Sequence, residues 1–354
     1  FKKGESFIRS EVQESIKNIN INISKSMYER YKNNLYEEIK ITRNENCLVT
    51  VVVPTFNGGN LLKECIDKLN IQKVDFNFEI LIIDSSSTDN SIEMIENNNN
   101  ISIYKIKQSD FQHGKTRNLA VALSKGEFVA FLTQDAIPAN ESWLTNIVNP
   151  MIHDLEVCAV FGRHEAHKNH TRLSKESMDS FFNLFSKSSK YRIDNNLKKY
   201  FSEHPSYRQH LHYYSDNNSC LRKSTWEKFP YQDVDYGEDQ LWADWIIKSN
   251  KTKAYSKDAI VNHSHEYNAK QEFERSYTEA NYFFKYFGYD LSQSRLEIEQ
   301  GLQAEAQNFL KKWKLIYKQD KDIDKNLQLD LIRAKREGYK LGVEDAIDEI
   351  IMRK

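Results

Sequence analysis

The sequence has few cysteines, glycines and prolines, and it has no long apolar run. Its 354 residues contain only 4 cysteines, 11 glycines and 5 prolines. The cysteines are far apart and form no Cys-x-x-Cys pair, which argues against a zinc site or a disulfide framework and favours a reducing cytoplasm. No run of about 18 apolar residues is present, so no membrane-spanning helix is expected. Peripheral association with a membrane surface remains compatible with the sequence.

An excess of either charge is also missing. Lys and Arg total 50, and Asp and Glu total 51, which gives a formal net charge of -1. Nucleic-acid-binding proteins usually carry a basic surplus, so we expect no nucleic-acid partner. A local basic pocket for a small anion is still compatible with this balance. Apolar residues make up 39% of the chain, which is enough for a sizeable core.

The start of the chain lacks the apolar segment of a signal peptide, and its first residue is Phe1 rather than Met. We therefore expect a cytoplasmic protein, associated at most with the inner face of the cell membrane. We also expect it to be part of a larger multidomain enzyme.

The spacing of apolar residues predicts an α/β sheet. Residues 1–46 are polar with spaced apolar positions, which predicts one or two amphipathic helices. Strands are expected at 47–53, 78–84, 101–106, 128–132 and 157–161, with helices between them at 59–69, 89–96, 115–123 and from 141. Such alternation predicts a mixed, mostly parallel sheet flanked by helices.

The pattern is less regular beyond residue 163. We expect a strand within 212–222, another at 252–261, and helices at 174–200, from 223, at 237–248, at 270–287 and from 291. The chain therefore divides into an N-terminal helical extension, 1–46, a central domain, 47–290, and a C-terminal helical extension, 291–354. The central domain has two halves, 47–165 and 166–290.

Polar residues follow three of the predicted strands. These runs are Pro54–Asn57, Asp84–Asp89 and Thr133–Pro138. In open α/β sheets, ligands bind outside the carboxyl ends of the strands. Each run alone is ordinary turn chemistry, but the coincidence of three indicates a ligand-binding edge. Neither a GxGxxG motif nor a Walker motif is present, so a dinucleotide fold and a P-loop are poorly supported.

Two carboxylates at these strand ends have a possible role in binding. Asp84 could accept a hydrogen bond from a nucleobase N–H, or it could serve as a turn residue. Asp135 offers a hard oxygen ligand that suits Mg²⁺ or Mn²⁺ bridging a diphosphate. The run Asp110–Asn118 opens a helix, whose N-terminus favours an anion, and Arg117 within it could contact a base or a phosphate.

Two further groups carry possible chemistry. Glu238 and Asp239 begin a predicted helix, where they could complement the helix dipole or supply a general base beside Trp242. His263 and His265 follow a predicted strand and point the same way in extended chain. Their imidazoles could complete a metal site, although isolated histidines usually have no such role.

These motifs resemble those of the inverting glycosyltransferases of family 2, which have the GT-A fold. The segments that carry the resemblance are Thr50–Asn57, Ile83–Asp89, Gln134–Ala136 and Gly237–Asp239. Four further segments are similar, more narrowly, to the bacterial rhamnosyltransferase branch: Phe111–Asn118, Leu132–Pro138, Phe161–Arg163 and His263–His265. The resemblance extends from Cys47 to Tyr289.

The resemblance implies the roles of individual residues. Binding of the nucleotide-sugar is implied for Pro54, Thr55, Asn57, Asp84, Arg117, Gln134 and Asp135. Asp135 would also bind Mg²⁺ or Mn²⁺, although Gln134 and Ala136 replace the flanking acids of the family motif. His263 or His265 would be the second protein ligand of the metal.

The catalytic base and the acceptor site are implied in the same way. Asp239 would be the general base, with Glu238 as its neighbour or substitute. Acceptor binding is implied for Trp242, Arg163 and Asn217.

The implied reaction is the inverting transfer of a sugar, L-rhamnose from dTDP-rhamnose, onto a saccharide in bacterial cell-surface polysaccharide biosynthesis. The acceptor would be an oligosaccharide or a lipid-linked saccharide. The alternative is a family 2 transferase that uses a UDP-hexose or a UDP-N-acetylhexosamine. A sugar-nucleotide pyrophosphorylase is less supported because Thr55–Gly59 is not a Gly-rich basic loop. A non-enzymatic carbohydrate-binding protein would not explain carboxylates and histidines at strand ends.

Overall fold

The computed structural model describes residues 36–42, 46–193, 196–291, 295–317 and 323–352. These residues form two compact units. The sheet unit holds the described residues up to Lys168 together with Ser177–Ser264, and the helical unit holds Asn169–Glu176 and the described residues from His265 onward. The helical unit therefore begins before the predicted boundary at 290. The helices predicted within 1–35 lie outside the described residues.

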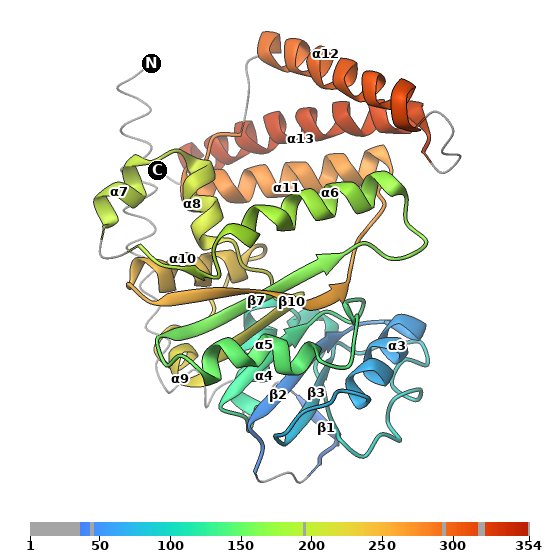
Figure 1. Cartoon of the computed structure of the whole chain (residues 1–354), viewed down its shortest axis with the longest axis vertical. Coiled ribbons are helices and arrows are strands. Elements are labelled where there is room, and N and C mark those ends of the chain that lie inside the picture. Colours follow the sequence, from blue (N-terminus) through green and yellow to red (C-terminus); the bar gives the residue numbers. More distant parts are fainter. Residues whose placement is uncertain (1–35, 43–45, 194–195, 292–294, 318–322, 353–354) are drawn as a thin grey trace. The chain divides into compact units, whose positions relative to one another are not determined.

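One mixed sheet forms the centre of the sheet unit (Figure 1). Its strands are β1 (Glu37–Lys40), β2 (Val49–Thr55), β3 (Phe78–Asp84), β4 (Ile101–Lys105), β5 (Phe128–Leu132), β6 (Ile137–Pro138), β7 (Val157–Glu165), β8 (Lys190–Tyr191), β9 (Asn218–Arg222) and β10 (Thr252–Asn262). Their order is β1-β4-β3-β2-β5-β9-β7-β10-β6, and β8 pairs with β10. The run β4-β3-β2-β5 is parallel, as predicted, and β9 lies antiparallel between β5 and β7.

Helices follow most of the strands. They are α3 (Gly59–Asn70), α4 (His113–Leu123), α5 (Trp143–Ile152), α6 (Arg172–Asn183), α7 (Leu197–Ser202), α8 (Pro205–His212), α9 (Lys223–Trp226), α10 (Glu238–Lys248), α11 (Ala269–Phe287), α12 (Arg295–Lys312) and α13 (Lys325–Met352). Short 3₁₀ turns lie at Gln108–Asp110 and Leu184–Lys187, and a π-helical turn at Trp313–Tyr317.

Three stretches predicted as helix differ, wholly or in part, in the described residues. Residues 91–97 form turns, because the Asp89 carboxylate accepts a hydrogen bond from the backbone N–H of Ser91 (3.0 Å), a local bond that competes with a helix. The predicted helix 174–200 ends at Asn183, and Tyr191 then pairs with β10. Residues 37–40, predicted as helix, form the edge strand β1 on β4.

Helices cover both faces of the sheet. Side chains alternate along each strand, so a strand with apolar residues throughout contributes to a core on each face. On β2, Val49, Val51 and Val53 belong to the core formed with α3 and α5, whereas Val52 belongs to the core formed with α4 and α10. Burying one such side chain contributes about 1.5–3 kcal/mol. Burial on both faces explains why β2 reads as a continuous β-branched run.

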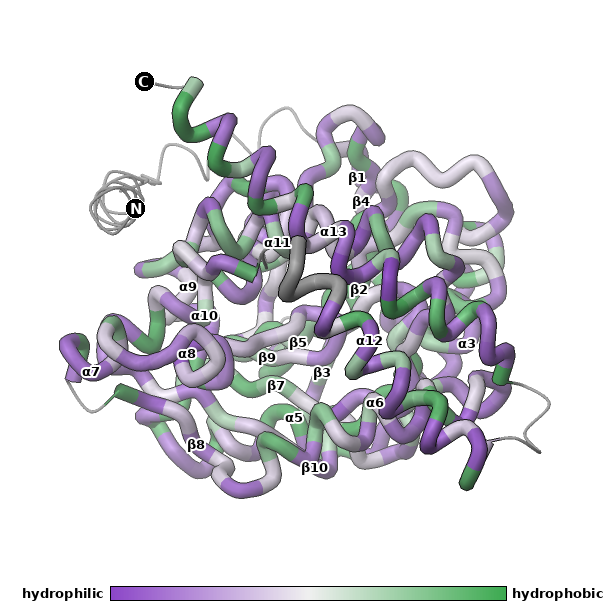
Figure 2. Tube along the Cα trace, turned by 90° about the horizontal axis from the view of Figure 1, so that it is seen from above, coloured by the Kyte–Doolittle hydropathy of each residue, from purple (hydrophilic) through white to green (hydrophobic). Residues whose placement is uncertain are grey.

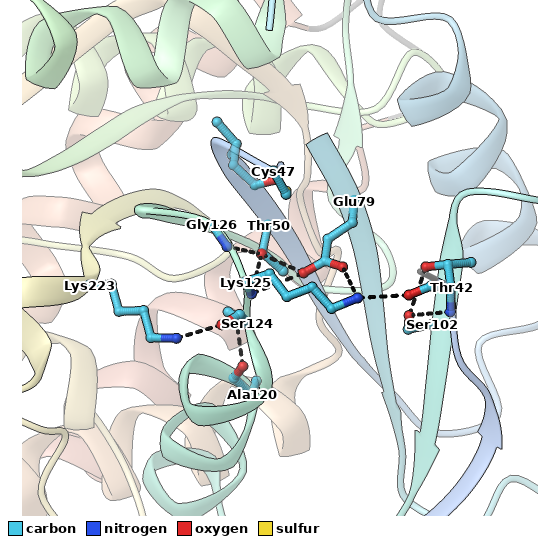
Figure 3. Close-up of polar contacts among 11 residues, drawn as sticks. Thr42, Cys47, Thr50, Glu79, Ser102, Ala120, Ser124, Lys125, Gly126 and Lys223 are labelled. Atoms are coloured by element: carbon cyan, nitrogen blue, oxygen red, sulfur yellow. Dashed lines mark hydrogen bonds and ion pairs between the residues drawn. The ribbon is translucent and has the colours of Figure 1, made fainter. Parts of the chain in front are cut away.

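A polar cluster lies at the amino ends of β2 and β3, at the opposite edge from Asp84 (Figure 3). The buried carboxylate of Glu79 accepts a hydrogen bond from the Thr50 hydroxyl (2.9 Å) and from the backbone N–H of Lys125 (3.1 Å). The Lys125 ammonium lies 3.4 Å from the same carboxylate and donates to the carbonyl of Thr42 (2.7 Å). Burial and the charge of Glu79 raise the pKa of Cys47 to about 11. The cluster joins four chain segments at the base of the sheet.

The helical unit is held together by close packing of α11 against α13. Gly338 and Gly342 lie one turn apart on α13, and a Cβ at Gly342 would meet the carbonyl oxygen of Tyr277 at 2.3 Å. The absence of a side chain is therefore what permits the approach. Along the last turns of α13, hydrophobic and hydrophilic residues alternate (Figure 2). No helix in the described part of the chain is both long enough and apolar enough to cross a bilayer.

Candidate active site

Two amide side chains join the loops that follow β2, β3 and β5. Gln134 accepts hydrogen bonds from the Phe56 backbone N–H (2.9 Å) and the Thr55 hydroxyl (3.2 Å), and it donates to the carbonyl of Phe56 (3.1 Å). Asn57 accepts from the backbone N–H of Thr88 (2.8 Å). The polar runs predicted to form a ligand-binding edge therefore do lie together at the carboxyl ends of these strands.

Asp84 and Pro54 lie at the same edge, where β2 and β3 end. Pro54 is in register with Ile83, one residue before Asp84. The Asp84 carboxylate is buried and accepts hydrogen bonds from the hydroxyl (2.6 Å) and the backbone N–H (3.1 Å) of Ser87. The carboxylate of Asp84 therefore stabilises its own turn. This contact is compatible with both predicted roles, turn residue and acceptor of a nucleobase N–H.

Asp135 and His263 are brought together by a two-residue strand. β6 pairs antiparallel with the end of β10, with Ile137 opposite Asn262, so the residues flanking this pair become neighbours. Oδ2 of Asp135 lies 3.7 Å from Nε2 of His263. Ligand atoms of Asp135, His263 and His265 all lie within 4.8 Å of one another. Only Ser264 separates His265, the first residue of the helical unit's last segment, from His263.

His164 is a neighbour of this group that the sequence did not reveal. Its ring lies edge-on to the His263 ring, with the centroids 5.2 Å apart. Burial, followed by the charge of His263, lowers the pKa of His164 well below its usual value. His164 therefore packs against His263 as a neutral ring. It lies on β7 within the stretch predicted as strand and loop, where no local signal marks it.

Glu238 and Asp239 have different environments at the start of α10. Glu238 is buried, and its carboxylate contacts the guanidinium of Arg117. Asp239 is partly exposed, and its carboxylate accepts hydrogen bonds from the backbone N–H groups of Gln240 (2.7 Å) and Asp216 (3.2 Å). Burial and the charge of Asp216 raise the pKa of Asp239 to about 6, while Arg117 opposes the shift. Of the two carboxylates, Asp239 is the more exposed.

Arg117, predicted to contact the nucleotide, is enclosed by acids. Its Nε lies 3.0 Å from Oδ2 of Asp216, and its Nη1 contacts Glu238. The side chain of Arg117 is 6% exposed. Asp216, Glu238 and Asp239 lie close enough together to hold a metal ion, but the guanidinium already supplies a positive charge there.

The first turn of α4 is held tightly against the loop that precedes α10. The Gln112 side chain donates to the carbonyl of Val234 (2.7 Å) and accepts from the backbone N–H of Lys115 (2.9 Å), which caps the helix. A Cβ at Gly114 would meet the carbonyl oxygen of Gln232 at 2.3 Å. Burial and Arg117 lower the pKa of His113 to about 4. These contacts give the Phe111–Asn118 string a structural reason.

The three residues predicted to bind the acceptor have different surroundings. Trp242 is fully buried between Tyr214 and Tyr231. Arg163 is paired with Asp179, Glu165 and Asn183. Asn217 points to the metal group instead: its Nδ2 lies 3.5 Å from Nε2 of His263.

Comparison with known proteins identifies the family. The model described as "Glycosyl transferase family 2" matches residues 50–228, just over half of the chain. The chain belongs to glycosyltransferase family 2. This family 2 glycosyltransferase is 33% identical to the O-antigen chain rhamnosyltransferase RfbN of Salmonella typhimurium, over 64% of this chain and 69% of that protein. It is 32% identical to the O-antigen chain rhamnosyltransferase WbaN of Salmonella anatum, over the same shares.

A solved structure supports the fold of this glycosyltransferase. The mannosyltransferase PcManGT from Pyrobaculum calidifontis, in complex with GDP-Man and Mn²⁺, aligns with a TM-score of 0.51 and 14% sequence identity, over 99% of this chain and 88% of that chain. At this identity the similarity concerns the fold alone. The predicted enzyme class, family and GT-A fold, with a helical region at its carboxyl side, are confirmed.

Proposed function

We propose that this family 2 glycosyltransferase transfers L-rhamnose from dTDP-rhamnose to a saccharide in bacterial cell-surface polysaccharide synthesis. The names and the 32–33% identity of the two Salmonella relatives support the sugar and the setting. The observation that carries the chemistry is the partly exposed Asp239, whose pKa is raised. Its carboxylate contacts the backbone N–H of Asp216, and the next residue, Asn217, contacts His263. The acceptor is an oligosaccharide or a lipid-linked saccharide.

The nucleotide lies at the joined ends of β2, β3 and β5. Asp84 accepts a hydrogen bond from the pyrimidine N–H, and the hydroxyl and backbone N–H of Ser87 hold the carboxylate in place. Asn57 and Gln134 hold the surrounding loops in the shape that the nucleotide meets. Pro54 and Thr55, the last two residues of β2, line the nucleotide site.

Asp135, His263 and His265 hold a divalent cation beside the diphosphate. One carboxylate and two imidazoles suit Mn²⁺ better than Mg²⁺, which prefers oxygen ligands in a strict octahedral arrangement. PcManGT, whose fold is similar, is named in complex with Mn²⁺. When bound, such an ion stabilises the negative charge of the departing diphosphate.

Asp239 accepts the proton of the acceptor hydroxyl as that oxygen attacks the anomeric carbon. The bond between the anomeric carbon and the diphosphate oxygen breaks in the same step, and the electron pair leaves with the diphosphate. A single displacement inverts the configuration, so a β-linked nucleotide sugar gives an α-rhamnoside. A pKa of about 6 leaves Asp239 mostly deprotonated at neutral pH and still able to take a proton.

The test is a donor panel with the purified chain and Mn²⁺. Release of nucleoside diphosphate is measured from dTDP-rhamnose, UDP-glucose, UDP-N-acetylglucosamine and GDP-mannose, with and without a rhamnose-terminated oligosaccharide. The proposal expects dTDP-rhamnose to give the highest kcat/KM, at least about tenfold above the others, since a sugar-pocket mismatch costs about that much. A UDP-sugar as the preferred donor would refute the rhamnosyl assignment and leave the family unchanged.

A further inference from the structure

One cation and three acids meet at the corner that contains Asp239. Arg117 comes from α4, Asp216 from the loop before β9, and Glu238 and Asp239 from the start of α10. The guanidinium of Arg117 lies between the carboxylates of Asp216 and Glu238. All three side chains are at most 6% exposed, so their charges are poorly screened by water and depend on one another.

The carboxylate of Asp239 is held by two backbone N–H groups, one of them from Asp216. The backbone N–H of Asp216 donates to Oδ2 of Asp239, and the backbone N–H of Gln240 donates to Oδ1. Asp216 is itself anchored on both carboxylate oxygens: Ser219 Oγ lies 2.5 Å from Oδ1, and Arg117 lies on the other side. The residue whose backbone N–H donates to Asp239 is therefore held by its own buried side chain.

Two nitrogens of Arg117 lie against buried acids. Nε is 3.0 Å from Oδ2 of Asp216, Nη1 contacts Glu238, and the carbon of the guanidinium lies 6.0 Å from the centroid of the buried Phe131 ring. Each guanidinium has a fixed fork of donors, so a residue bound in this way is held in one orientation. The geometry is that of a support behind the base, not of a side chain that meets a ligand.

We propose that Arg117 and Asp216 are a pair of positioning residues for Asp239, with Arg117 also neutralising the two buried acids beside it. The inference rests on the proposed function, in which Asp239 is the base. It replaces a donor-binding role for Arg117 by an indirect role in proton transfer.

The two residues act on Asp239 with opposite sign. The charge of Asp216 raises the pKa of Asp239, and the charge of Arg117 lowers it. Glu238, the adjacent acid on α10, contacts Arg117 as well. Loss of Arg117 leaves the negative charges of the acids without a compensating cation, so the midpoint of the acid limb of the pH profile moves to higher pH. Loss of the Asp216 charge moves this midpoint to lower pH, while Glu238 keeps Arg117 in place.

The experiment compares Arg117→Met, Arg117→Lys and Asp216→Asn with the unchanged protein. Thermal unfolding reports folding, and calorimetry with dTDP, UDP and GDP in the presence of Mn²⁺ reports nucleotide affinity. Release of nucleoside diphosphate from dTDP-rhamnose between pH 5 and pH 9 reports kcat and KM. A positioning role predicts a fall in kcat of at least about tenfold in Arg117→Met and a smaller fall in Arg117→Lys, with every nucleotide Kd within about threefold. The midpoint of the acid limb rises in Arg117→Met and falls in Asp216→Asn.

A weakening of nucleotide affinity by about tenfold or more in both Arg117 variants, with kcat unchanged at saturating donor, would assign Arg117 to the donor and overturn the inference. Acid limbs that coincide in all variants would overturn it as well. If Arg117→Met does not fold, Arg117→Lys and Asp216→Asn carry the same comparison, because each keeps the size and polarity of the original side chain. If dTDP-rhamnose is not turned over, the proposed donor is wrong, and the nucleotide affinities still decide between the two roles of Arg117.

Discussion

Nδ2 of Asn217 lies 3.5 Å from Nε2 of His263, and Asn217 directly follows Asp216, whose backbone N–H contacts Asp239. One loop before β9 therefore touches both the metal group and the base. In an in-line displacement the attacking oxygen and the leaving diphosphate lie on opposite sides of the same carbon. A loop that contacts both groups links their positions, and the separation of the reacting groups is the quantity that positioning must control.

Replacing the base should abolish turnover while leaving nucleotide binding intact. Asp239→Asn keeps the size of the side chain but cannot take a proton, so kcat should fall by about 10²–10⁴-fold. The Kd for dTDP should stay within about threefold, because the carboxylate does not contact the nucleotide in the proposed arrangement. Asp235→Asn, an exposed acid in the preceding loop, is the matched control and should retain full kcat. Normal turnover by Asp239→Asn would show that Asp239 is not the general base.

The activity should rise with pH around the pKa of Asp239. That pKa is raised to about 6, and only the deprotonated carboxylate accepts a proton, so kcat should increase from pH 5 to a plateau above pH 7. Measurement of kcat between pH 5 and pH 9 at saturating donor and Mn²⁺ checks this limb, and a profile that is flat over this range would contradict it. His113 does not contribute there, since its pKa is lowered to about 4.

Removal of a metal ligand should weaken nucleotide binding only when the metal is present. His263→Ala should lower the affinity for Mn²⁺ and reduce the affinity for dTDP by about 10–100-fold in its presence, without changing the affinity measured in EDTA. The exposed His153, which caps α5, supplies the control His153→Ala. Full activity of the unchanged protein in EDTA would contradict the metal site altogether. The same measurement on His265→Ala shows whether one histidine or both are ligands.

A substitution in the polar cluster of Figure 3 should lower the stability of the protein and leave its activity unchanged. Glu79→Ala leaves the backbone N–H of Lys125 and its ammonium without their buried partner, which should reduce the free energy of unfolding by about 1–3 kcal/mol. The kcat of the folded protein should not change, because Glu79 lies at the amino end of β3 and the candidate site lies at the carboxyl end. Denaturant titration and kcat are measured together, with the exposed Glu93→Ala as control. A large loss of kcat at full folding would show that the two edges are coupled.

Local sequence accounted well for the strands and for the edge that they form. The predicted spans 78–84 and 128–132 coincide with β3 and β5, because both are apolar runs buried on two faces. Parallel neighbours place their carboxyl ends together, so the clustering of the polar runs after β2, β3 and β5 followed from the strands alone. The sequence predicted a strand within 212–222, which contains β9, but it did not reveal that β9 lies antiparallel between β5 and β7, with Asp216 and Asn217 just before it.

The sequence by itself determined the family, the strand ends and the residue types available for chemistry, since these depend on patterns within short segments. The tertiary structure decided which of those residues face a substrate. Glu238 and Asp239 are neighbours in the chain, but successive helical residues point about 100° apart. One carboxylate is therefore buried against Arg117 and the other remains partly exposed. Trp242 and Arg117 suit a binding site by their chemistry, and only the packing of α4 and α10 on the sheet directs them inward.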